Sequence, residues 1–90
     1  MKTHEELLNM SMEHQLGYLQ WLAGQVYLKE SLPEQVREDA LTMEELGVHH
    51  YHDIATGRCS LAVTLKTNLD ELEQKIISDI ENYQKLLEGE

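Results

Sequence analysis

The stretch from residue 3 to residue 30 carries apolar side chains at helical spacing over most of its length, and this pattern constrains the fold most strongly. One stripe recurs at intervals of three, four and seven residues and comprises Leu8, Met12, Leu19, Leu22 and Val26. A second set widens that stripe and comprises Leu7, Met10, Trp21 and Leu28. A helix that is apolar over so much of its surface must be covered on two sides. The sequence therefore predicts that this helix forms the core of the fold.

Two further helices are expected, so the predicted fold class is mainly α. The segment "SLPE" supplies Ser31 as an N-cap, and the second helix is expected over residues 33–46, with Gly47 ending it. The third helix is expected over residues 68–87, where apolar residues again recur at spacings of three and four. Ninety residues make one domain, residues 1–90.

Between the second and third helices the sequence favours a small β-hairpin, which would make the fold α+β. The segment "CSLAVTL" alternates apolar and polar residues, as strands do, whereas "VHHYHDI" alternates less cleanly. The intervening "ATGR" contains the glycine that a short turn prefers. Alternatively, residues 59–66 are an early start of the third helix. A lone hairpin is marginal in water, so it would have to pack on the helices or pair with a second copy.

The charge balance is strongly acidic, with 7 Lys and Arg against 17 Asp and Glu and a formal net charge of −10. Direct binding to nucleic acid or to an anionic membrane needs a basic face, so neither is expected. A basic protein partner remains open, as does a surface that imitates the charge of DNA. One cysteine and the lack of a signal-like or membrane-spanning apolar run predict a cytoplasmic protein. Because so short a chain buries little surface, we also expect a homodimer.

Acidic side chains gather on the outer face of the second predicted helix and form the candidate partner-binding set: Glu34, Glu38, Asp39, Glu44 and Glu45. Trp21 joins this set as an interface hot spot if it proves exposed. Gly17 and Gly24 lie seven residues apart on one side of the first helix. They allow another backbone to approach closely, are tolerated exposed positions, or mark a weak point where the helix bends.

Three of the five histidines and the only cysteine fall within residues 46–65. On a strand, His50 and His52 would share a face, and Cys59 across the turn would offer a third ligand of the kind that zinc accepts. On a helix, the convergent set would instead be His49, His52 and Asp53. The plainer interpretation makes the histidines half-exposed polar residues and Cys59 a small buried one.

Catalysis is not expected, although Cys59 and a neighbouring histidine contain the atoms of a nucleophile and a base. The sequence has no phosphate-binding loop, no zinc-protease helix and no nucleophile elbow. We therefore expect a small acidic regulatory module without a cofactor that binds protein and antagonises a basic, nucleic-acid-binding partner, as some phage and mobile-element proteins do by analogy. The alternatives are a zinc-binding hairpin built on the histidines and Cys59, and a dimeric enzyme with its pocket across the interface.

Overall fold

The computed structural model describes residues 1–57 and 69–89, and its described elements are helical. They are α1 (His4–Leu8), α2 (Met12–Leu28), α3 (Glu34–Thr42), the π-helical turn η1 (Met43–Gly47), α4 (Val48–Ala55) and α6 (Leu69–Leu87). The backbone keeps right-handed helical angles through both ends of η1. Consequently α3, η1 and α4 form one continuous helix, residues 34–55, which we call the arm.

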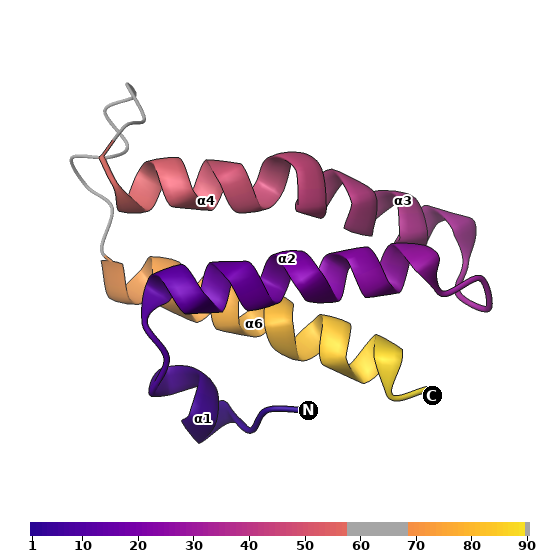
Figure 1. The fold of residues 1–90 in the computed structure, drawn as a ribbon, viewed down its shortest axis with the longest axis horizontal. Coiled ribbons are helices and arrows are strands. Elements are labelled where there is room, and N and C mark those ends of the chain that lie inside the picture. The colour runs from indigo at the N-terminus through magenta and orange to yellow at the C-terminus, as the bar shows by residue number, and fades with distance from the viewer. Residues whose placement is uncertain (58–68, 90) are drawn as a thin grey trace.

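Helix α2 lies between the arm and α6, as the prediction of a central first helix required (Figure 1). The arm runs antiparallel to α2, whereas α6 runs in the same direction as α2. The short α1 packs against α6 near the N-terminus of the chain. The mainly helical class is therefore confirmed.

The predicted β-hairpin is wrong. Its first strand, residues 48–54, is the helix α4, and no strand occurs among the described residues. Val48, Tyr51 and Ile54 recur every three residues, so they can reach the core together only from a helix. The second expected strand and Cys59 lie outside the described residues.

Gly47 does not end the second helix, contrary to expectation. Its φ is −66°, an ordinary helical value, and the chain continues into α4. A Cβ on Gly47 would come within 2.5 Å of the Met43 sulfur, so glycine leaves room for that side chain inside the wider turn. Gly47 is therefore needed for the packing of Met43 and does not adopt the left-handed conformation that glycine commonly has at a helix end.

The first predicted helix is divided in two. Thr3 and Glu6 form the reciprocal capping box of α1, and α1 ends at Leu8. The Ser11 side chain then accepts a bond from the His14 backbone N–H, 3.2 Å away, and begins α2. The buried Gln15 side chain donates to the carbonyls of Leu7 and Met10 at 2.8 and 3.3 Å, satisfying backbone groups near the break.

The core lies where α2 meets α6 and the arm. Its buried apolar residues are Leu7, Leu16, Leu19, Leu22, Ala23, Val26, Ala40, Val48, Leu72, Ile76, Ile77 and Ile80.

The buried Gln84 side chain makes three hydrogen bonds. It accepts from the Tyr18 hydroxyl at 2.7 Å and from the Lys2 N–H at 2.9 Å, and it donates to the Lys2 carbonyl oxygen at 3.0 Å. These bonds join the N-terminus, α2 and α6.

Candidate functional site: an acidic groove beside α2

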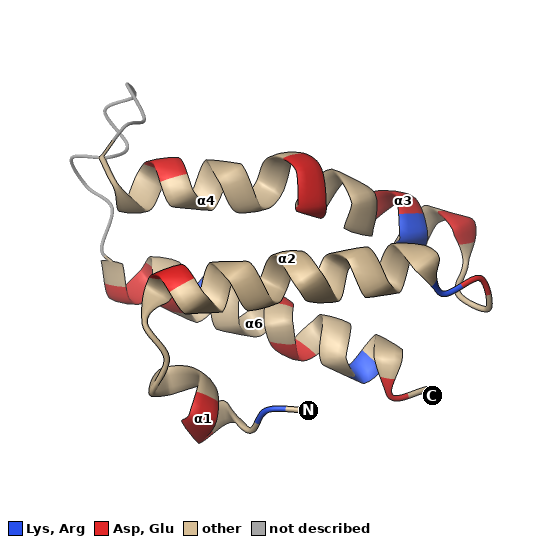
Figure 2. Cartoon of the chain, viewed as in Figure 1, with Lys and Arg blue, Asp and Glu red and all other residues tan. Residues whose placement is uncertain are grey.

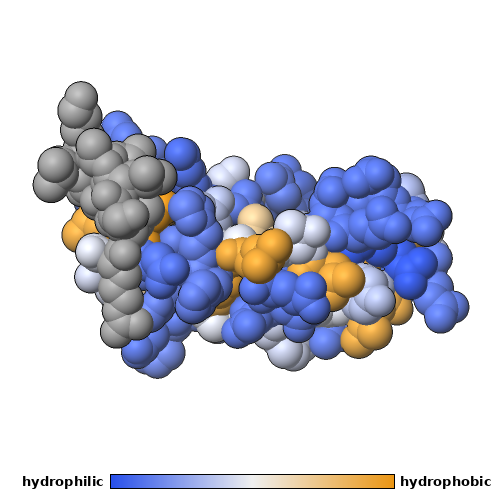
Figure 3. Space-filling view, turned by 90° about the horizontal axis from the view of Figure 1, so that it is seen from above, coloured by the Kyte–Doolittle hydropathy of each residue, from blue (hydrophilic) through white to orange (hydrophobic). Residues whose placement is uncertain are grey.

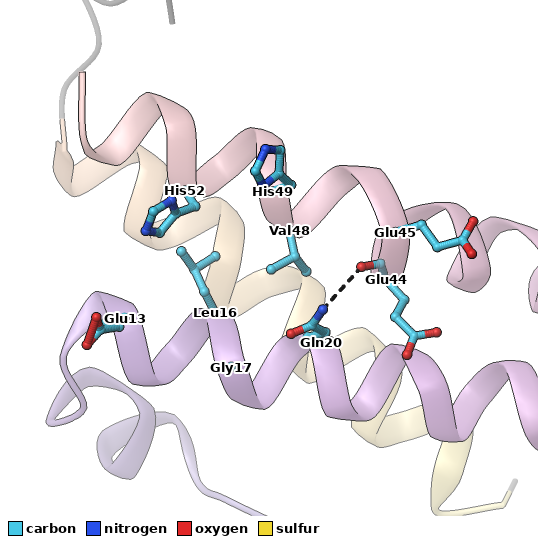
Figure 4. Close-up of a pocket in the computed structure, with 9 residues that line it drawn as sticks. All are labelled: Glu13, Leu16, Gly17, Gln20, Glu44, Glu45, Val48, His49 and His52. Carbon is cyan, nitrogen blue, oxygen red and sulfur yellow. Dashed lines mark hydrogen bonds between the residues drawn. The ribbon is translucent and has the colours of Figure 1, made fainter. Parts of the chain in front are cut away.

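A groove of about 580 Å³ runs between α2 and the arm (Figure 4). We call it the acidic groove, because three of its lining residues are glutamates and none is lysine or arginine. It is lined by Glu13, Leu16, Gly17, Gln20, Glu44, Glu45, Val48, His49 and His52. Its volume is within the range of roughly 300–1,000 Å³ that ligand pockets usually have.

The bottom of the acidic groove is apolar and partly open because of one glycine. Leu16 and Val48 are buried and contribute the apolar surface. A Cβ added to Gly17 would have no other atom within 4 Å, so this position leaves space between the helices. An apolar bottom below carboxylates suits a side chain with an aliphatic stem and a charged end.

The carboxylates come from two helices. Glu13 lies in the first turn of α2, and Glu44 and Glu45 belong to η1. The Glu44 carboxylate lies over Gly24, where it is 3.1 Å from the position of an added Cβ. Gln20 Nε2 makes only a long contact, 3.5 Å, with the Glu44 carbonyl oxygen. The described lining of the groove contains no lysine or arginine to pair with these carboxylates.

The arm contains a π-helical turn at the acidic groove, and Glu44 and Glu45 belong to it. A π turn is wider than an α turn and holds more residues, so it changes which side of the helix the following residues occupy. Figure 4 shows Glu44, Val48 and His52 in succession along the side of the arm that faces α2. Such single π turns occur frequently at functional sites.

The structure separates the five acidic residues predicted to share one face. Glu44 and Glu45 line the acidic groove, whereas Glu34 and Glu38 line a smaller hollow of about 250 Å³ with Tyr27, Arg37 and Leu41. Asp39 lies elsewhere on the arm, where it accepts a 2.9 Å bond from Gln35. The sequence prediction missed Glu13, Gly17 and His49 as partners of Glu44, because only tertiary packing brings α2 beside the arm.

Arg37, the only basic residue of α3, contacts the C-terminal end of α2. Its Nε donates to the Tyr27 carbonyl oxygen at 2.9 Å, and its guanidinium lies 5.9 Å from the centre of the Tyr27 ring. This contact places the cation at the negative end of the α2 dipole. Arg37 therefore lies in the smaller hollow and not in the acidic groove.

The histidines lie on α4 in the helical arrangement. Residues two apart on a helix point about 200° apart, so His50 and His52 do not face one site. His49 and His52 both line the acidic groove, and His49 Nε2 lies 3.6 Å from Asp53 Oδ2. Within residues 1–57 and 69–89 no three His, Cys, Asp or Glu side chains are placed to hold a metal ion.

Trp21 is exposed, as its proposed role in an interface requires. Its side chain retains 56% of its accessible surface and stacks on the Tyr18 ring, with centroids 6.1 Å apart and planes 14° apart. Tyr18 in turn is fixed by its bond to Gln84. The indole is therefore held on a rigid aromatic neighbour at the surface of α2.

Two partly buried tyrosines, Tyr51 and Tyr83, pack against the core from α4 and α6. The Tyr51 hydroxyl donates to Asp79 Oδ2 at 2.7 Å. Burial, followed by the bond to the Asp79 carboxylate, raises the pKa of Tyr51 well above its ordinary value of 10.0. Burial also raises the pKa of Tyr83, with smaller contributions from the charges of Asp79 and Asp39. Both tyrosines therefore stay neutral phenols at neutral pH.

The outward face of the arm is mostly hydrophilic, interrupted by small hydrophobic patches (Figure 3). In the part of the chain that the structure describes, no helix has the length and apolar character of a membrane span.

Comparison with protein-family models, curated proteins and solved structures finds no match for this chain.

Proposed function

We propose that this chain is a small, non-enzymatic binding protein whose acidic groove receives a lysine or arginine side chain of a basic protein partner. The observation that carries the proposal is the lining of the groove. Glu13, Glu44 and Glu45 border a space with an apolar bottom and no lysine or arginine. Burying a cation there would satisfy carboxylates that have no cationic partner in the lining.

The groove has the two chemical parts that such a side chain needs. Its aliphatic stem would lie along Leu16 and Val48, and its charged end would reach the carboxylates. The space beside Gly17 admits the stem between the helices. The net charge of −10 would also attract a basic partner from a distance and accelerate encounter at low salt.

The broader role we propose is antagonism of a partner that uses its basic surface to bind nucleic acid. Glu34 and Glu38 are exposed on α3 and extend the negative charge along the arm beyond the groove (Figure 2). A partner bound along the arm would have its cationic side chains occupied by carboxylates in place of phosphates. Such a complex would weaken steeply with added salt.

The test is an NMR titration of the labelled protein with blocked Ala-Lys-Ala and Ala-Arg-Ala peptides. Amide signals of Gly17, Gln20 and Val48 are expected to shift. A peptide with norleucine in place of lysine keeps the stem but lacks the charge, and it should produce little change. Shifts spread evenly over the acidic surface, with none concentrated at the groove, would contradict the proposal.

Two double variants with the same change in net charge separate the groove from charge in general. Glu44→Gln with Glu45→Gln removes carboxylates from the groove, and its affinity for the basic peptides is expected to fall about tenfold. Glu34→Gln with Glu38→Gln removes the same charge outside the groove and should leave the affinity within about twofold. Equal losses in the two variants would show that net charge, and not the groove, controls binding.

A further inference from the structure

The solvent-facing side of α2 carries two exposed large hydrophobic side chains and no Asp, Glu, Lys or Arg. Trp21 and Leu28 retain 56% and 66% of their accessible surface and lie seven residues apart, so they share one side of the helix. His14, Gly17 and Gln25 are also exposed on that side. We call these five residues the outer face of α2.

This face lacks charge altogether. Residues 14–28 contain no Asp, Glu, Lys or Arg, although the chain has 17 acidic and 7 basic residues. Figure 2 shows α2 without charged residues between its two ends. Although Gly17 also lines the acidic groove, the exposed side chains of Trp21, Gln25 and Leu28 carry no charge, and two copies with a net charge of −10 repel each other least where such uncharged side chains meet. The charge pattern therefore favours a second copy of the chain as the occupant.

The shape of the outer face offers one open position beside one large side chain. Space next to Gly24 is taken by the Glu44 carboxylate, but an added Cβ at Gly17 would meet nothing within 4 Å. Trp21 follows Gly17 by four residues, about 6 Å along the axis. In an antiparallel pair related by a two-fold axis near the level of Leu19, each Trp21 would lie over Gly17 of the other copy. Such reciprocal contacts are characteristic of a two-fold dimer.

We propose that the outer face of α2 is the interface of a homodimer, in which α2 pairs antiparallel with α2 of a second copy and Trp21 of each packs over Gly17 of the other. The 17 residues of α2 span about 26 Å, so the interface is small. Interfaces below about 1,200 Å² generally belong to weak or transient complexes. This dimer therefore dissociates on dilution in the micromolar range.

Sedimentation velocity of the full chain from about 1 μM to about 200 μM measures this association directly. The wild type is expected to pass from monomer to dimer over that range. Trp21→Ala should weaken dimerisation about tenfold or more, because a central exposed tryptophan is the residue type on which interfaces most depend. Leu46→Ala is the matched control: Leu46 is exposed to 66% on η1, outside the outer face, and its variant should dimerise like the wild type. A wild type that stays monomeric throughout, or equal effects of the two variants, would overturn the proposal.

A cross-linking experiment tests the antiparallel register. In a Cys59→Ser background, a Gly17→Cys protein and a Trp21→Cys protein are mixed in equal amounts and oxidised. The mixed disulfide is expected to dominate over both symmetric products, because the proposed pairing places residue 17 of one copy against residue 21 of the other. The second, unmodified contact in the mixed pair still joins Trp21 to Gly17. Symmetric products in excess would exclude this register.

The dimer and the binding function are separable experimentally, although Gly17 belongs to both surfaces. Trp21 does not line the acidic groove, so Trp21→Ala should weaken association about tenfold or more, uncover Gly17 and retain the peptide-induced shifts of Val48. The Glu44→Gln and Glu45→Gln double variant should do the reverse. Failure of one proposal therefore leaves the other to be judged by its own measurement.

Discussion

The two sides of α2 differ in how completely they are packed. Toward α6, Gln84 makes three hydrogen bonds that join α2, α6 and the N-terminus, and Lys29 Nζ donates to the Leu86 and Leu87 carbonyl oxygens at 3.0 and 3.2 Å. Toward the arm, Arg37 of α3 holds the end of α2 through its 2.9 Å bond to the Tyr27 carbonyl oxygen, but beside η1 and α4 the Gln20 contact with Glu44 measures 3.5 Å and a groove separates the helices. One helix thus has a closed side and an open side.

This difference indicates that one side of α2 contributes mainly to stability and the other mainly to binding. Binding sites are commonly drawn from less tightly packed regions, while the stability that supports them resides elsewhere. Here the closed side holds α2 in place through α6, so the open side can keep unneutralised carboxylates. Substitutions on the closed side should therefore affect stability, and substitutions on the open side should affect binding.

The largest expected contrast uses two leucines of α2. Leu19 is fully buried, whereas Leu16 lines the acidic groove and is 4% exposed. Leu19→Ala should lower the free energy of unfolding by about 3–5 kcal/mol, because it leaves an enclosed cavity. Leu16→Ala should cost about 2–3 kcal/mol, because the lost volume adjoins an open groove that neighbours can fill. Urea denaturation measures both; losses within about 0.5 kcal/mol of each other would remove the contrast.

A smaller contrast compares two glutamines. Gln84→Ala leaves the Tyr18 hydroxyl and the Lys2 backbone groups without their partner and should cost about 1–3 kcal/mol. Gln20→Ala removes only the long contact on the open side, and its stability should stay within about 0.5 kcal/mol of the wild type. Thermal unfolding followed by circular dichroism gives both values. A Gln20→Ala loss as large as that of Gln84→Ala would show that the arm is held as firmly as α6.

The smallest expected effect concerns the tyrosine that links α4 to α6. Because the folded-state pKa of Tyr51 lies above its ordinary value of 10.0, the unfolded chain loses this proton first as pH rises. The stabilisation is therefore fully present below about pH 10 and decreases above it. Tyr51→Phe should cost roughly 1 kcal/mol at neutral pH, because it removes the bond to Asp79.

Unfolding measured at pH 8 to 11 tests the pH dependence. The variant should lose less stability than the wild type above pH 10, with a residual decrease from Tyr83 and Tyr18, whose pKa values burial also raises. An unchanged slope in the Tyr51→Phe protein would mean that Tyr51 contributes nothing to it.

Local signals in the sequence predicted much of the helical framework. The third helix was expected over residues 68–87, and α6 spans Leu69–Leu87. The sequence prediction missed the break at Ser11 because the apolar stripe continues across it. Gln15 stabilises the break by donating to the Leu7 and Met10 carbonyl oxygens, and apolar periodicity does not reveal these bonds. The sequence predicts a helix end at Gly47 because glycine usually has that role, whereas in the structure Gly47 makes room for Met43.

The acidic groove was less predictable than the helices. The acidic residues were predicted to share one face, but at about 100° per residue even a regular helix places Glu44 about 120° from Glu38. The structure accordingly puts Glu44 and Glu45 at the acidic groove and Glu34 and Glu38 at the smaller hollow. The groove also depends on α2 lying beside the arm, which periodicity alone does not specify. Of the set expected to converge on a helix, His49 and His52 line the groove and Asp53 does not, and the described residues contain no group of three placed to hold a metal ion.

The π turn sets the rotational phase of α4. If Met43–Gly47 became a regular α-helix at unchanged length, all that follows would rotate by about 100° about the axis, the turn of one residue. Val48 would then leave the core, and His52 would turn away from α2, although no side chain had changed its chemistry. Deleting one residue together with the wide turn would instead keep both residues on their present side, because the π turn accommodates about one extra residue. The side of α4 that meets α2 thus depends on the width of a single turn.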